Sequence, residues 1–313
     1  MTDAAQRMAV CAGVRDPCAR AESILRELCG WDRDDGTIRT RTHAAARRAT
    51  TTRDEREDDE RFGPASGAIE VAIDAGKVNA DTGWRDVTVA AFCKRKAGAS
   101  ASLEDGDKRT LPTPSVRTAV AAIEDADRSA GQVRTASDRL GATTASDVTV
   151  RADGAEWIGN VGAEVFPQAT GVSDPFHAPE HIADAVKGVW GNDTAETTQR
   201  TATGRWALLG AGESGIEQWI AAGFDGSPTG ASGEPRIGLA AYLAKHPTRL
   251  GDADRRAGGR SIGSGLVEGS IEQLVDRRLK QTGAKWKVAN VGPLVELAAP
   301  IDAPDWNALW TAA

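Results

Sequence analysis

The fold is decided at residues 67–74, which read GAIEVAID. Ile69, Val71 and Ile73 alternate with other residues, and the run ends at Asp74. Successive side chains of a β-strand point to opposite faces of a sheet, so this period of two predicts a strand.

The segments that follow alternate between strand-like and helix-like patterns. Three further apolar runs predict strands, and three longer periodic stretches predict helices. Such alternation predicts an α/β sheet with helices packed on its faces. The predicted strands are Val87 to Cys93, Val148 to Val150 and Ala169 to Ser173, and the predicted helices are Ser115 to Leu140, Glu156 to Phe166 and a helix running on to Trp190.

The chain divides into four predicted parts. Residues 1–66 read as helices: Ala19 to Leu28 is amphipathic, and Asp34 or Asp35 can cap the next helix. This N-terminal helical segment is similar to a helix-turn-helix and is a candidate DNA contact, although helical hairpins of this kind are common. The other parts are the sheet at 67–190, a mainly helical insertion at 191–260, and a long helix from Ser264 to Gly283 with a C-terminal tail within 261–313.

Composition limits the class of protein. The 313 residues are 40% hydrophobic, which is enough for a sizeable core. No apolar run approaches the roughly 18 residues that cross a bilayer, and no secretory signal is visible, so we expect a cytoplasmic protein without membrane contact. The four cysteines lack the spacing of a zinc ribbon or a disulfide scaffold.

A basic stretch begins in the last turns of the predicted long helix, although the formal net charge of −7 does not suggest a nucleic-acid binder. Such a stretch suits phosphate contacts. On charge alone, a solvated helix face with cations near its C-terminus is the better interpretation. The basic residues are Arg277, Arg278, Lys280, Lys285 and Lys287.

Two acids, Asp74 and Asp153, follow predicted strands, and the carboxyl ends of strands are where open α/β sheets bind ligands. Neighbouring carboxylates at such ends can hold Mg²⁺, which prefers oxygen ligands. Glu268, one turn into the last helix, is the candidate third carboxylate. With 45 acidic residues in the chain, the alternative that all three are solvated acids is favoured on the residue pattern alone.

A competing motif is the G-x-G-x-x-G run of Gly210, Gly212 and Gly215, which matches the phosphate-binding turn of a nucleotide-binding oxidoreductase. The turn-rich stretch after it offers no second strand with the ribose-binding acid. A loop between helical pieces of the insertion is the better interpretation.

Several segments, taken together, resemble the ISKra-type insertion-sequence transposases, which are relatives of the mutator-like DDE transposases. The similarity runs in the correct order from about Ala19 to the tryptophans at 306 and 310, and matches in order are more specific than any single motif. The segments are IDAGKVN (73–79), GWRDV (83–87), ADGAEWI (152–158), DPFHAPEH (174–181), IGSGLVEG (262–269) and RRLKQTGAKW (277–286).

This resemblance implies an RNase H-like catalytic domain with a helical insertion. It implies that Asp74, Asp153 and Glu268 are the catalytic residues and bind Mg²⁺ or Mn²⁺, and that Asp174 and His177 support the site. The implied function is metal-dependent DNA strand cleavage and strand transfer, with water and then a freed 3′-hydroxyl as nucleophiles. A catalytically inactive remnant with residual DNA binding is the alternative.

The resemblance also implies partners. Transposon ends and target DNA would be bound by a homodimer or a higher oligomer, with the basic residues from Arg277 to Lys287 on the DNA. Trp286 would stack on an unpaired base, with a core anchor as an equally weighted alternative. The family's cysteine-rich N-terminal region is missing, so we expect an N-terminally truncated relative.

Overall fold

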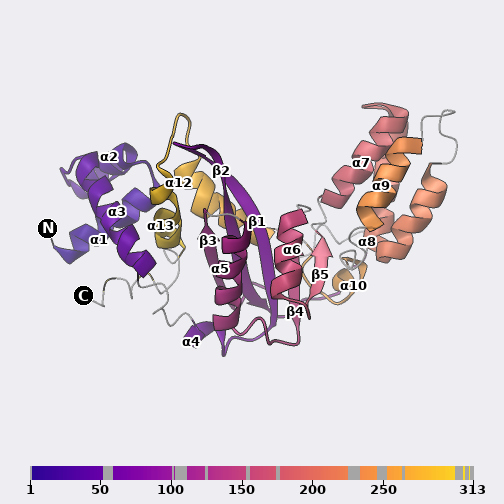
Figure 1. The fold of residues 1–313 in the computed structure, drawn as a ribbon, viewed down its shortest axis with the longest axis horizontal. Helices are drawn as coiled ribbons and strands as arrows, with labels where there is room; N and C mark the ends of the chain where they lie inside the picture. The colour runs from indigo at the N-terminus through magenta and orange to yellow at the C-terminus, as the bar shows by residue number, and fades with distance from the viewer. Residues whose placement is uncertain are drawn as a thin grey trace.

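The structure is a computed structural model that describes residues 2–51, 59–100, 102, 111–123, 126–152, 156–173, 177–224, 233–244, 252–262, 265–299, 306 and 310. A five-stranded sheet lies between two groups of helices, one formed by the N- and C-terminal parts of the chain and one by its middle (Figure 1). None of the described helices is long and apolar enough to cross a bilayer.

The sheet is mixed, with strand order β3-β2-β1-β4-β5. The first three strands form an antiparallel meander, and β4 and β5 run parallel to β1. The predicted α/β class is therefore confirmed. The strands are β1 (Ala68–Ala80), β2 (Gly83–Arg95), β3 (Val116–Ala122), β4 (Val148–Ala152) and β5 (Thr170–Ser173).

Two predicted boundaries are wrong. The first strand does not end at Asp74 but continues to Ala80, because residues 75–80 pair with residues 83–88 of the adjoining hairpin strand. The predicted helix from Ser115 begins only at α5 (Ala126–Arg139), and its first part is β3. The valine spacing there fits a helix, but pairing of Val116–Ala122 with β2 decides the conformation.

Strand alternation sends the side chains of β1 into two different cores. Val71 and Ile73 pack with Phe92, Val133 of α5 and Ile158 of α6 (Glu156–Val165). The residues between them face the opposite way, towards the helices of the C-terminal part. The sheet is thus covered on both faces, as an α/β fold requires.

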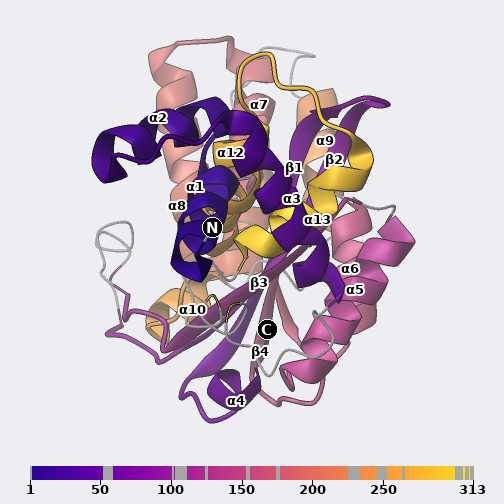
Figure 2. The same ribbon diagram turned by 90° about the vertical axis from the view of Figure 1, so that its left-hand side faces the viewer.

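The N-terminal part contains the predicted helices and joins the C-terminal part. The helices are α1 (Asp3–Arg15), α2 (Cys18–Cys29) and α3 (Asp35–Thr51), and a single turn, α4 (Asp59–Phe62), precedes the sheet. Asp34 caps α3, since its Oδ1 accepts a hydrogen bond from the Thr37 amide at 2.8 Å. In Figure 2, α1, α2 and α3 lie in front of the C-terminal α12 and α13.

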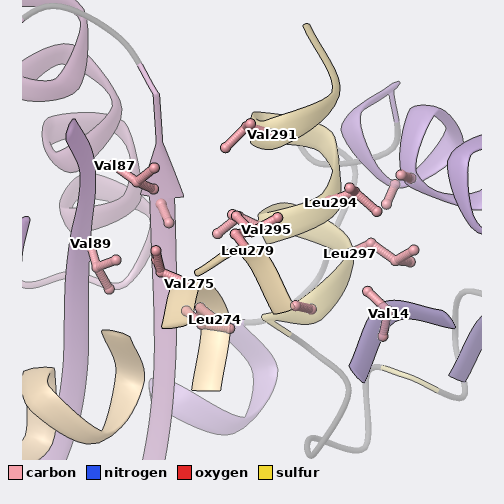
Figure 3. Close-up of a cluster of buried hydrophobic side chains, with 14 of the residues drawn as sticks. Val14, Val87, Val89, Leu274, Val275, Leu279, Val291, Leu294, Val295 and Leu297 are labelled. Atoms are coloured by element: carbon pink, nitrogen blue, oxygen red, sulfur yellow. The ribbon is translucent and has the colours of Figure 1, made fainter. Parts of the chain in front are cut away.

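The long C-terminal helix is interrupted. It consists of α11 (Gly265–Ile271), a π-helical segment (Glu272–Asp276) and the short α12 (Arg277–Leu279), and it is followed by α13 (Val288–Ala298). Figure 3 shows how these segments form one core: Val87 and Val89 of β2 face Val275, and α13 lies between that group and Val14 of α1. One buried cluster therefore connects the sheet to both ends of the chain.

The middle of the chain forms a separate helical group with its own core. It comprises α7 (His177–Trp190), α8 (Ala195–Gly223) and α9 (Gly233–Ala244), and α10 (Asp252–Ala257) leads back to the sheet. The run Gly210, Gly212 and Gly215 lies inside α8, which kinks at Gly212 (φ 59°, ψ −135°). The oxidoreductase alternative is therefore wrong, because a nucleotide-binding turn needs a strand before the glycines.

Candidate active site on strand β1 and helix α11

Asp74 lies on the face of β1 that the C-terminal helices cover. Ala72 and Val78 of the same strand belong to the core that contains Val267 of α11, and side chains two residues apart share one face of a strand. Asp74 is half-buried, and its Oδ1 lies 2.6 Å from the amide nitrogen of Ala75. Its carboxylate therefore belongs to the α11 side of the sheet.

The end of β4 lies beside Asp74. Ile73 pairs with Ala152 in the parallel β1–β4 ladder, and these two residues directly precede Asp74 and Asp153 in the sequence. Asp153 itself lies outside the described residues. The described register thus places Ile73 beside Ala152, and the location of Asp153 stays a prediction.

Helix α11 crosses β1 next to Asp74. A Cβ atom added at Gly76 would lie 3.0 Å from Val275 Cγ1 and 3.2 Å from Ile271 Cγ2, so the helix and the strand are in close contact there. Glu268 is exposed and lies one helical turn before Ile271, just as Asp74 lies one strand repeat before Gly76. Asp74 and Glu268 therefore belong to two elements that touch each other at Gly76 and Ile271.

The donors at this site suit a hard divalent cation. Asp74 and Glu268 offer carboxylate oxygens, which Mg²⁺ and Mn²⁺ accept as ligands. Within the described ranges, no group of three or more His, Cys, Asp or Glu side chains could hold a metal ion. The predicted triad includes Asp153, which lies outside these described ranges.

A buried charged cluster surrounds Glu70, which lies four residues before Asp74 on the same strand. Glu70 is 5% exposed, and its carboxylate lies 3.3 Å from Arg95 Nε, 3.6 Å from Arg255 Nη2 and 4.0 Å from Arg151 Nη2. Three guanidinium groups therefore surround one carboxylate in the protein interior. We call Glu70, Arg95, Arg151 and Arg255 the Glu70 cluster.

The Glu70 cluster attaches the segment before α11 to the sheet. Arg151 and Arg255 both donate to the carbonyl oxygen of Ser261, at 2.5 and 2.8 Å, and Arg255 also donates to Thr149 Oγ1 at 2.6 Å. These bonds hold residue 261 against β4, seven residues before Glu268. None of these residues was predicted from the sequence, although charged residues inside apolar strands, in AIEVAI and VTVRA, are the signal that could have identified Glu70 and Arg151.

Cys93 lies against the Glu70 cluster. Its Sγ is 3.7 Å from a Glu70 carboxylate oxygen. Burial, followed by the negative charge of Glu70, raises the pKa of the thiol to about 12. Cys93 therefore stays protonated at neutral pH and is a packing residue, in keeping with the absence of a cysteine motif in the sequence.

Four of the predicted DNA-binding side chains are exposed: Arg277, Lys280, Lys285 and Lys287. Arg278 makes contacts within the chain instead. Its Nε donates to the carbonyl oxygen of Gly13 at 3.0 Å, and its guanidinium lies 4.7 Å from the centre of the Trp286 ring. Burial lowers the pKa of Arg278.

Trp286 is anchored by both its backbone and its side chain. Its amide donates to Asn79 O at 2.9 Å, its carbonyl accepts from the Asp81 amide at 2.7 Å, and its Nε1 donates to Leu279 O at 3.0 Å. The ring also packs against the core shared by the sheet and the C-terminal helices. These contacts are those of the core-anchor alternative, and base stacking by Trp286 stays a prediction.

Of the two predicted supporting residues, Asp174 and His177, the structure describes only the backbone of His177. His177 is the first residue of α7, which follows β5, the strand next to β4. The imidazole of His177 and the whole of Asp174 lie outside what the structure describes. Their role stays a prediction.

Comparisons with known proteins find similarity among solved structures. No protein-family model matches the sequence, and no curated protein matches it. A solved structure that is similar to the chain is the Drosophila P element transposase strand transfer complex, with 11% sequence identity and a TM-score of 0.36 over 95% of this chain and 78% of that chain.

Proposed function

We propose that the chain is a DDE-type transposase with an RNase H-like catalytic domain, which cleaves DNA strands and transfers them in a metal-dependent reaction. The supporting observation is the relation between β1, β4 and α11. The residues that precede Asp74 and Asp153 are paired in adjacent parallel strands, and the helix bearing Glu268 packs on the Asp74 face of the sheet. The mixed sheet order β3-β2-β1-β4-β5 suits this domain.

The proposed site residues have two different roles, metal binding and support of the metal ligands. Asp74, Asp153 and Glu268 hold the divalent ions, and Asp174 and His177 support them from the segment after β5. Divalent ions held by these residues would supply charge neutralisation at the phosphate and would make the attacking water more acidic. Catalysis then depends on positioning rather than on a covalent enzyme intermediate.

The reaction has two displacements at phosphorus. Water attacks first, the bond from phosphorus to the 3′ oxygen breaks, and a 3′-hydroxyl and a 5′-phosphate result. The freed 3′-hydroxyl then attacks a phosphate of the target DNA, so that one phosphodiester bond forms as another breaks. The exposed Arg277, Lys280, Lys285 and Lys287 would contact the DNA backbone of transposon ends or target, with the chain acting as a dimer or a higher oligomer.

The test is cleavage of labelled DNA that carries the terminal repeats flanking the coding sequence, with Mg²⁺ or Mn²⁺. We expect Glu268→Gln to lose at least a hundredfold in cleavage rate, because the amide keeps the shape of the side chain but loses the charge that holds the metal. Glu272→Gln is the matched control: Glu272 is exposed, lies one turn later, and should retain activity.

The alternative, a catalytically inactive remnant with residual DNA binding, predicts a different result. A folded wild-type chain that binds the DNA but cleaves it no faster than Glu268→Gln would show that this copy has lost the reaction. Equal loss in Glu268→Gln and Glu272→Gln would argue against a special role for Glu268.

A further inference from the structure

We propose that a second surface, on a different face of α11 from Glu268, binds the phosphodiester backbone of a DNA duplex. A cavity of about 1180 Å³ lies between α11, the beginning of β3 and the end of α1. We call it the arginine groove, because every charged side chain that lines it is an arginine: Arg15, Arg61, Arg95, Arg117 and Arg277.

The charge of the arginine groove is opposite to that of the molecule. The whole chain has 45 acidic against 38 basic residues, yet no acidic side chain lines this cavity in the described part of the chain. Arg95 is neutralised by Glu70 at 3.3 Å. Arg117 and Arg277 are exposed at the surface of the groove. The planar guanidinium group fits phosphate oxygens with two parallel hydrogen bonds, so this lining favours phosphates as the occupant.

The walls of the groove also suit an extended backbone. One wall is residues 113–119, which lead into β3, the last strand in the sheet order. Another wall is α11, where Gly265 and Gly269 have no side chain to fill the cavity. A Cβ atom added at either glycine would meet no heavy atom within 4 Å. The absence of side chains at Gly265 and Gly269 therefore leaves space for a ligand beside α11.

The groove is separate from the proposed catalytic residues. Gly265, Leu266, Gly269 and Ser270 line it, whereas Val267 is buried towards the sheet and Glu268 is not among the lining residues. A duplex bound there would contact a different face of α11 from the one that carries Glu268. This DNA would be bound in addition to the DNA that is cleaved, and it would not itself be cleaved. The identification of DNA as the natural ligand rests on the proposed function. The preference of the groove for anions rests on its arginine lining.

Binding measured in EDTA tests the groove without any cleavage. We expect Arg117→Glu to weaken binding of a labelled DNA duplex by about tenfold. It should also reduce the slope of log K against log salt by about 1, because one phosphate contact is lost. Arg236→Glu is the matched control, since Arg236 is exposed on α9 and the change of charge is the same. Equal effects of the two variants, or none for Arg117→Glu, would overturn the proposal.

A steric variant keeps the test independent of charge. Gly269→Leu places a side chain in the groove, and we expect it to weaken duplex binding by at least fivefold. Gly131→Leu, at an exposed position of α5 that is equally open, should leave binding unchanged. Full affinity in folded Gly269→Leu would also overturn the proposal. Because these assays contain no metal, loss of cleavage in the wild type would not affect their outcome.

Discussion

Glu70, a charged residue in an apolar strand, holds several distant segments of the chain together. Its carboxylate lies within 4.0 Å of three buried or half-buried guanidinium groups, and two of these also hold Ser261 in front of α11. A buried charge is stable only where it is paired and hydrogen-bonded. The Glu70 cluster is therefore a structural link between β1, β4 and the segment that positions Glu268.

Removing the charge of Glu70 should be costly. We expect Glu70→Gln to lower the free energy of unfolding by about 3–5 kcal/mol, because three guanidinium groups lose their shared buried counterion. Glu164→Gln is the control: the Glu164 side chain is 63% exposed and pairs with Arg134, so its loss should cost at most about 1 kcal/mol. Urea denaturation of both variants measures the difference, and equal destabilisation would contradict this role.

At the scale of elements, the contact between β1 and α11 depends on the absence of a side chain at Gly76. A Cβ atom there would lie 3.0–3.3 Å from three atoms of Val275 and Ile271. The helix can thus approach the strand that carries Asp74. The π-helical segment Glu272–Asp276 starts at this contact, and such segments are frequent at functional sites.

Gly76→Val should separate the two elements. We expect a loss of about 1–3 kcal/mol in the free energy of unfolding, because the added methyl groups overpack the interface with Val275. Cleavage should fall as well, since Glu268 would move relative to Asp74. Lys77→Val is the control, because Lys77 is the exposed neighbour in the same strand and valine suits strands. Unchanged stability in Gly76→Val would show that α11 adjusts without cost.

At the scale of the whole molecule, the two ends of the chain meet at a basic contact. Arg278 follows the Glu268 helix and bonds to Gly13 of α1, and His43 of α3 lies near it. Burial, then the positive charges of Arg278, Arg47 and Arg39, lowers the pKa of His43 below its usual 6.5. The N-terminal helices are thus held to the C-terminal part through a contact that disfavours a further positive charge.

The protein should therefore become less stable as the pH falls. Below pH 6.5 the unfolded chain protonates His43 before the folded chain does, so the unfolded state binds more protons and the free energy of unfolding decreases. The loss begins near pH 6.5 and ends once the pH is below the lowered folded pKa. His43→Gln should remove this part of the pH dependence in thermal unfolding, and an unchanged pH profile would contradict the assignment to His43.

Local patterns in the sequence were enough to predict two features. The α/β class followed from apolar periodicity, and the start of α3 followed from its Asp34 cap. Each of these needs only residues that are close in the sequence. The candidate site stays a prediction: β1 continues past Asp74 to Ala80, and the structure does not describe Asp153, Asp174 or the His177 side chain.

Long-range contacts in the folded chain overrode several other local preferences. Residues 116–122 became a strand because β2 offered backbone partners, although their valine spacing fits a helix. The G-x-G-x-x-G run became a kinked helix, and Arg278 and Trp286 turned inward to contacts with Gly13, Asn79 and Leu279. The Glu70 cluster joins residues 70, 95, 151 and 255, which are far apart in the sequence. Hydrogen-bond partners and buried charges of this kind depend on long-range contacts, which no local pattern contains.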